Sequence, residues 1–263
     1  PWVVDASWKS IKTPLLFDPG EQWEYGTSID WAGMVVEAIT GRRLGEVMQT
    51  RILGPLGMND TAFTMTPSMK ARQATIHARE DGDGSLIPLD GVTLPQEPEL
   101  HMGGHGLYGT ATDYVKFIRM WLNDGRSDSG EQILRPETVE MASRNHLPEG
   151  MHIKMLPGVS ATNTAKSILP VSKPRLSNDA EFFPGMPKTW ALTFMINEEP
   201  APTGRPAGSL AWAGLANLYY WIDRKNGVGG YWATQIFPFA DPTSVAGFLG
   251  MERATYKYAK LRG

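Results

Sequence analysis

Residues 217–237 read NLYYWIDRKNGVGGYWATQIF. Aromatic and branched residues dominate both ends of this stretch, which is typical of β-strands. The two ends are joined by Arg224-Lys225-Asn226-Gly227, and Asn-Gly is a strong signal for a tight hairpin turn. The sequence therefore predicts one strand over 217–223 and a second, antiparallel strand over 230–237.

The flanking segments extend this hairpin into a layered fold. Residues 190–197 predict another strand, and the apolar spacing over 241–261 predicts a closing helix. Upstream, helices are expected over 28–40, 44–52 and 113–123, with another starting at Pro136. We expect Gly41 to end the first of these helices and Thr112 to cap the third. The residues expected on the buried face of the first helix are Ile29, Ala32, Gly33, Val36 and Ile39. Together these elements predict an α/β (α+β) fold with an antiparallel sheet and helices packed against it.

Two long segments are rich in polar and turn-forming residues. The first, 67–98, contains the tight turn Asp81-Gly82-Asp83-Gly84, and the second, 147–188, is expected to form loops that cover a cleft. The expected division is a mainly helical lobe with loops over 1–102 and an α/β lobe over 103–263, both within one domain.

The composition limits the possible functions. The formal net charge is -3 and 41% of the residues are hydrophobic, so nucleic acid and anionic membranes are not expected partners. Cysteine is absent, which excludes a thiol nucleophile and disulfides. We expect a soluble, cytoplasmic protein, although Pro1 does not look like a natural start and any targeting signal would precede it.

Two short patterns are candidates for chemistry: Tyr25-Gly26-Thr27-Ser28 ahead of the first predicted helix, and Gly208–Leu215 ahead of the hairpin. Each pattern alone has an ordinary structural explanation. A tyrosine near a tryptophan at a helix start is usually a packed aromatic, and a run of small residues at a strand edge usually forms a turn. Their order along the chain, with the motifs between them, is what makes them informative.

In that order the sequence resembles the serine beta-lactamase-like superfamily, and within it the fungal acyltransferases of the lovastatin pathway. That superfamily also contains class C beta-lactamases, DD-peptidases and the family VIII esterases. The resemblance covers nearly the whole chain. It is carried by these motifs in sequence order: Asp18-Pro19-Gly20-Glu21-x-Trp23-x-Tyr25-Gly26, Asp30-Trp31-Ala32-Gly33, Glu37-x-x-Thr40-Gly41, Pro55-Leu56-Gly57-Met58, Gly103-Gly104-x-Gly106-Leu107-Tyr108-Gly109 and Gly208-Ser209-Leu210.

The resemblance implies acyl transfer through a serine, activated by a lysine three residues later on the same helical face. Tyr25 matches the tyrosine that relays the proton, and is the implied catalytic residue. Trp212-Ala213-Gly214 matches the third motif of the family, and Leu215 would donate the backbone N–H of the oxyanion hole. Tyr108, Trp190 and Tyr219 are candidates for a substrate pocket, although core packing explains each of them equally well.

Two departures from the family pattern change the expectation. Beta-lactamases begin the third motif with a cation, whereas this chain has Trp212, which favours uncharged carboxylic esters or thioesters over beta-lactams. No serine in the chain has a lysine three residues later. We therefore expect the Ser-x-x-Lys pair upstream of Pro1, on a companion segment or chain, and expect these 263 residues alone to be inactive.

The function expected from the resemblance is a serine carboxylesterase or acyltransferase acting through an acyl-enzyme. The alternatives are a beta-lactamase or penicillin-binding DD-peptidase, and a non-catalytic homologue. No cofactor is expected. His101 and His105 have the four-residue spacing of a helical metal pair, but the glycines between them argue against a helix, so no metal is expected.

Overall fold

The computed structural model describes residues 6–15, 17–21, 23, 25–80, 84–89, 94–149, 151, 177–178, 180 and 182–260. An antiparallel sheet lies at its centre, with strands in the order β3-β4-β5-β6-β7. The strands are β3 (Lys188–Trp190), β4 (Met195–Asn197), β5 (Leu210–Gly214), β6 (Leu218–Asp223) and β7 (Val228–Trp232). The predicted hairpin is confirmed, because β6 pairs with β7 and Gly227 adopts a left-handed conformation in the turn.

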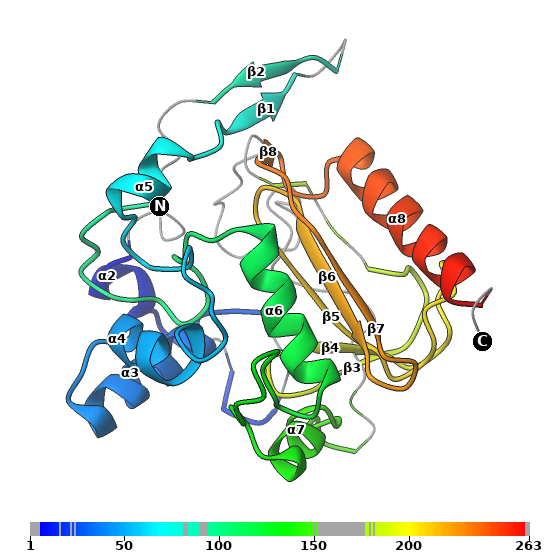
Figure 1. The fold of residues 1–263 in the computed structure, drawn as a ribbon, viewed down its shortest axis with the longest axis horizontal. Helices are drawn as coiled ribbons and strands as arrows, with labels where there is room; N and C mark the ends of the chain where they lie inside the picture. Colours follow the sequence, from blue (N-terminus) through cyan, green and yellow to red (C-terminus); the bar gives the residue numbers. More distant parts are fainter. Residues whose placement is uncertain are drawn as a thin grey trace.

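Helices lie on both sides of this sheet (Figure 1). On one face lies α6 (Ala111–Leu122), and on the other lies the C-terminal helix α8 (Pro242–Lys260). Side chains of β6 alternate between the two layers, as the pleat of a strand requires. Tyr220 and Ile222 pack in the cluster that includes α6, whereas Tyr219 and Trp221 pack against α8.

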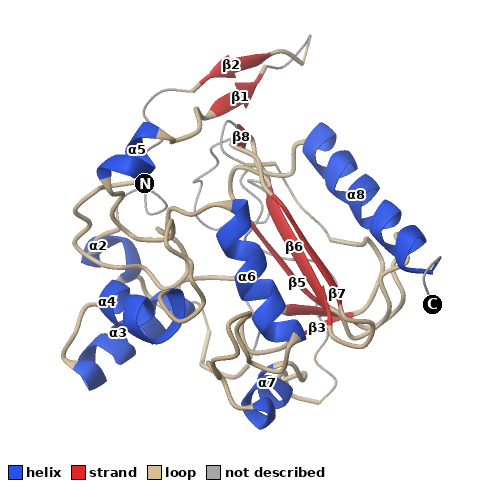
Figure 2. Cartoon of the chain, viewed as in Figure 1, coloured by secondary structure: helices blue, strands red, loops and turns tan. Residues whose placement is uncertain are grey.

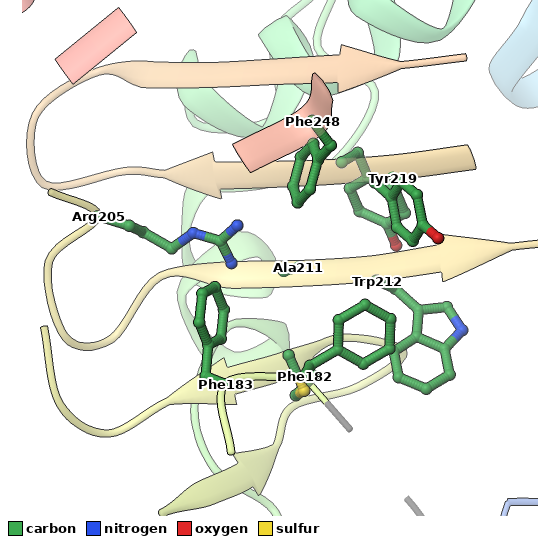
Figure 3. A pocket seen from close by; sticks show the side chains of 9 residues that line it. Phe182, Phe183, Arg205, Ala211, Trp212, Tyr219 and Phe248 are labelled. Atoms are coloured by element: carbon green, nitrogen blue, oxygen red, sulfur yellow. The ribbon is translucent and has the colours of Figure 1, made fainter. Parts of the chain in front are cut away.

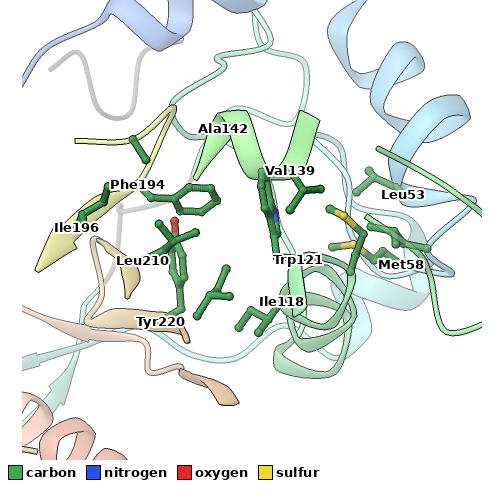
Figure 4. Packing of buried hydrophobic residues seen from close by; sticks show 14 residues of the cluster. Leu53, Met58, Ile118, Trp121, Val139, Ala142, Phe194, Ile196, Leu210 and Tyr220 are labelled. Carbon is green, nitrogen blue, oxygen red and sulfur yellow. The ribbon is translucent and has the colours of Figure 1, made fainter. Parts of the chain in front are cut away.

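The hydrophobic core on the α6 side joins the helical part of the chain to the sheet. In Figure 4, Ile118 and Trp121 of α6 face sheet residues such as Leu210. Leu53, the last residue of η1, and Met58, in the loop after it, belong to the same cluster. Each fully buried side chain of this size stabilises the fold by roughly 1.5–3 kcal/mol.

The N-terminal part is mainly helical, and a small second sheet projects from it (Figure 2). That sheet has the order β2-β1-β8, in which β1 is antiparallel to β2 and parallel to β8. Its strands are β1 (His77–Arg79), β2 (Leu86–Pro88) and β8 (Ile236–Phe237). The remaining helices are α2 (Trp8–Ile11), α3 (Ser28–Thr40), α4 (Leu44–Met48), η1 (Gln49–Leu53), α5 (Pro67–Ala71) and α7 (Pro136–Ala142). None of the described helices combines the length and the apolar character that a membrane crossing requires.

Three expectations about the elements were wrong in detail. The strand predicted over 190–197 is two strands, because a turn at Thr193 (φ 77°) lets the Ala191 N–H donate to the Phe194 carbonyl. The strand predicted over 230–237 divides between β7 and β8, which belong to different sheets. The cap of α6 is Thr110, whose hydroxyl accepts a hydrogen bond from the Asp113 N–H, so the helix begins before Thr112.

The predicted buried face of α3 was wrong except at Gly33. The helix ends at Gly41 as expected, but its buried residues are Asp30, Gly33 and Met34. Ile29 and Ile39 are 41% and 80% exposed. The polar Asp30 is buried because its carboxylate has a partner inside the fold, described below. The turn at 81–83 and most of the expected loops over 147–188 lie outside the described residues, and the expected division into two lobes stays a prediction.

Candidate active site

The structure brings Tyr25 and Trp212 together from opposite ends of the chain. Tyr25 lies just before α3, and Trp212 lies in the middle of β5. Their ring centroids are 5.4 Å apart with the planes tilted by 45°. The Tyr25 side chain as a whole is 37% exposed. The two motifs that the sequence singled out therefore meet at one place.

The surroundings of Tyr25 raise the pKa of its hydroxyl. Burial is the main cause, and the nearby Asp30 carboxylate adds to it. A hydrogen bond from Trp212, whose only donor is the indole N–H, acts in the opposite direction. Because none of these groups is a cation, Tyr25 as it stands is a protonated phenol near neutral pH.

Asp30 is buried in the first turn of α3 and holds the glycine-rich loop. Its carboxylate accepts a hydrogen bond from the Gly104 N–H at 2.8 Å, and His105 Nδ1 lies 3.9 Å from the same oxygen. A Cβ on Gly103 would lie only 2.2 Å from the Ile29 carbonyl oxygen. The Gly103-Gly104 pair is therefore required so that this loop can lie directly on the start of α3, beside Tyr25.

We expect Gly103→Ala to destabilise the protein by about 1–3 kcal/mol, because the backbone must move to relieve the contact with Ile29. Equilibrium denaturation measures the change. Gly250→Ala in α8 is the control, because a Cβ there meets no atom within 4 Å. Equal stability of the Gly103→Ala and Gly250→Ala proteins would contradict the packing of this loop.

Aromatic side chains continue from Trp212 on the central strand β5 to the edge strand β3. Trp190 of β3 stands edge-on to Trp212 at 4.7 Å, and Trp23 lies 4.7 Å from Trp190. Phe182 contacts Trp212 from another side, at 5.9 Å. Trp190 was a sequence candidate for the substrate pocket, and the structure places it next to Trp212. Trp23 stands in the same motif as Tyr25, but its position in the aromatic row was not foreseen, because no sequence signal links it to β3.

A small cavity of about 10 Å³, room for roughly one water molecule, lies beneath Trp212 between β5 and α8. Figure 3 shows Trp212 at one end and Arg205 with Phe183 at the other. Tyr219, another pocket candidate, lines this cavity, but its hydroxyl donates to Asn217 and its ring stacks on Phe248.

Tyr108 is not brought into this group by any contact of the described residues. Its hydroxyl donates to the Leu94 carbonyl and accepts from Gln96, and its backbone pairs with Ala62. These bonds give it a structural role in the N-terminal part of the chain. Ala213 and Gly214 complete β5, and Leu215 follows in the turn to β6, close to Trp212 in sequence.

His101 and His105 have separate partners in the structure. His101 accepts the Gly45 N–H at 3.0 Å through Nδ1 and stacks on Phe63, while His105 faces Asp30. Within the part of the chain that the structure describes, no group of three or more histidine, aspartate or glutamate side chains could hold a metal ion.

Comparison with known proteins identifies relatives of this arrangement. The chain is 33% identical to lovastatin esterase of Penicillium rubens over 227 residues, covering 84% of this chain and 52% of that protein. It is 31% identical to monacolin J acid methylbutanoyltransferase of Aspergillus terreus, covering 88% of this chain and 53% of the relative. A solved mutant of simvastatin synthase from Aspergillus terreus superimposes with a TM-score of 0.77 at 29% identity, covering 95% of this chain and 60% of the other.

The chain thus spans between about half and three fifths of the length of these relatives. The family model described as Beta-lactamase matches residues 9–249, which is nearly the whole chain. The antiparallel sheet with helices on both faces agrees with the expected architecture. This chain belongs to the beta-lactamase family.

Proposed function

We propose that the chain contributes the proton-relay and oxyanion elements of a serine esterase or acyltransferase. The observation that carries this proposal is the contact between Tyr25 and Trp212, which unites the two motifs that the family uses for acyl transfer. The relatives are named as an esterase and a methylbutanoyltransferase, which supports chemistry on acyl groups.

Tyr25 serves as the proton relay in this proposal. With its pKa raised by burial and by Asp30, it needs a nearby cation before it can accept a proton near neutral pH. A lysine three residues after the nucleophilic serine supplies that cation, on a companion segment or chain outside these residues. The Leu215 N–H donates to the oxyanion of the tetrahedral intermediate.

The substrates proposed are small, uncharged carboxylic esters or thioesters. Trp212 stands where beta-lactamases place a cation, and it cannot pair with a carboxylate. The row formed by Trp23, Trp190 and Trp212 offers an apolar surface beside Tyr25. Aromatic faces of this kind favour apolar groups on the ester over charged ones. Water or an alcohol then resolves the acyl-enzyme.

One observation favours a second candidate, a homologue that keeps the fold without catalysis. No serine of the chain has a lysine three residues later, so these 263 residues do not contain the nucleophilic pair. Without such a pair from elsewhere, acyl transfer by this route is excluded.

Labelling with a fluorophosphonate, followed by intact mass spectrometry, separates the candidates. A serine that gains the mass of the probe, together with hydrolysis of 4-nitrophenyl butyrate, supports the proposed enzyme. Rapid turnover of nitrocefin with weak ester hydrolysis would identify a beta-lactamase instead. Absence of labelling in the protein purified together with its companion segment or chain would reject the enzyme and leave the non-catalytic homologue.

A further inference from the structure

Asn217 is a fully buried amide whose hydrogen bonds are all satisfied. Its Nδ2 donates to the carbonyl oxygens of Ile236 and Pro238, both at 2.8 Å. Its Oδ1 accepts from the Tyr219 hydroxyl at 2.7 Å and from the Asp241 N–H at 3.0 Å. Two donors and two acceptors are the complete capacity of an asparagine side chain.

The partners also fix which way the amide points. Carbonyl oxygens can only accept, so they must face Nδ2, and a backbone N–H can only donate, so it must face Oδ1. Asn217 itself lies in the left-handed region, with φ at 58°. Asparagine tolerates this conformation better than most residues, and glycine tolerates it without making any of these four bonds.

These bonds tie the turn after β5 to two distant elements. Leu215, Ala216 and Asn217 connect β5 to β6, and the Thr234 hydroxyl donates to the Ala216 carbonyl. Ile236 belongs to β8, and Asp241 begins α8 by accepting the Ser244 N–H on its carboxylate. Asp241 also pairs with Arg79 of β1. The turn is thus anchored at the meeting point of both sheets and the C-terminal helix.

From this network we infer that Asn217 is a positioning residue for the Leu215 amide. This inference rests on the proposed function, in which that amide binds the oxyanion. The Leu215 N–H lies two residues before Asn217 in this three-residue turn. The Thr234 hydroxyl holds the Ala216 carbonyl of the turn, and the Asn217 side chain fixes the end of the turn to β8 and to the start of α8. An oxyanion donor stabilises the transition state only if it is held in place before the reaction.

The test compares Asn217→Gly with Asn226→Gly. Glycine keeps the left-handed backbone at 217 and removes only the amide, while Asn226 is an exposed asparagine in the turn at the opposite end of β6. Backbone ¹⁵N relaxation of the full chain gives the order parameter of the Leu215 amide. We expect it to fall from about 0.85 to below about 0.6 in Asn217→Gly and to stay unchanged in Asn226→Gly.

The second readout is ester turnover by the preparation that reacts with the serine probe. We expect kcat to fall by about 10²-fold, which is the lower end of the loss caused by removing an oxyanion donor. KM should change by less than about threefold. Thr234→Val removes the hydroxyl bonds to the Ala216 and Asn217 carbonyls and leaves the Asn217 amide in place. It should change the order parameter and kcat in the same direction but less, and it replaces Asn217→Gly if that protein does not fold.

The outcomes separate the inference from the proposed function. An unchanged Leu215 order parameter in Asn217→Gly overturns the positioning role. A mobile amide with unchanged kcat overturns it as well, because the amide would then not be used in the reaction. If the wild-type protein does not react with the probe, the proposed function is rejected. The Leu215 amide then has no oxyanion to bind, even if Asn217→Gly lowers its order parameter as expected.

Discussion

Replacing Tyr25 by phenylalanine is expected to lower the rate of acyl transfer by about 10²–10⁴-fold, the usual contribution of a positioned proton-transfer group. The ring remains, so the packing against Trp212 is kept and only the hydroxyl is lost. The measurement is kcat/KM for 4-nitrophenyl butyrate with the protein that reacts with the serine probe. Thermal unfolding of the same variant should be close to that of the wild type, because the hydroxyl is not part of the core.

Tyr258→Phe is the matched control. Tyr258 is an exposed tyrosine of α8, on the opposite side of the sheet from α6, and its substitution should leave kcat/KM unchanged. If Tyr25→Phe retains activity within about threefold of the wild type, Tyr25 is not the proton relay. The Tyr25–Trp212 contact would then be an aromatic packing contact alone.

The largest effect on stability is expected at the buried ion pair between Arg205 and Glu252. Arg205 Nε lies 2.5 Å from Glu252 Oε1, and the two side chains are 1% and 0% exposed. Phe183 lies against the guanidinium, 5.0 Å away. Arg205→Ala should reduce the free energy of unfolding by about 3–5 kcal/mol, because it leaves the Glu252 carboxylate buried without its counter-ion.

Chemical denaturation measures this loss against two controls. Arg119→Ala removes one member of an exposed pair with Asp128 and should cost at most about 1 kcal/mol. The double variant Arg205→Met with Glu252→Leu removes both charges and should recover most of the stability, since apolar pairs often replace buried ions without loss. If Arg205→Ala costs no more than Arg119→Ala, the pair is not buried as described.

The sequence predicted the parts of the fold that local chemistry determines. The Asn226-Gly227 turn, the end of α3 at Gly41 and the C-terminal helix each have a signal within a few residues, and each is confirmed. The turn at Thr193 contains no glycine or asparagine that would indicate a turn in the sequence. Residues 190–197 were therefore predicted as one strand. The orientation of α3 was wrong for a different reason. Apolar spacing alone did not show that the helix would turn its Asp30 side inward, because the partner of Asp30 is a loop amide far along the chain.

In the candidate site, too, the sequence predicted the residues of local motifs and missed the residues whose partners are distant in the chain. The motifs around Tyr25 and Trp212 were recognisable in the sequence, and the structure places them in contact. The catalytic roles assigned to Tyr25 and to the Leu215 amide stay predictions. Trp23 and Asn217 were missed because their importance comes from partners in distant strands and turns. A weak signal for Asn217 was present, since it is an asparagine directly before the hairpin residues Leu218–Asp223, and asparagine is suited to a left-handed turn.

The row of Trp23, Trp190 and Trp212 gives the protein a built-in optical signal. Indole rings with centroids 4.7 Å apart do not absorb light independently, because their transition dipoles couple and split into a pair of bands of opposite sign in circular dichroism. The sign and size of that pair depend on the angle between the rings. A molecule that settles on this row and rotates one indole would therefore change the spectrum, so occupancy beside Tyr25 can be followed in unlabelled protein.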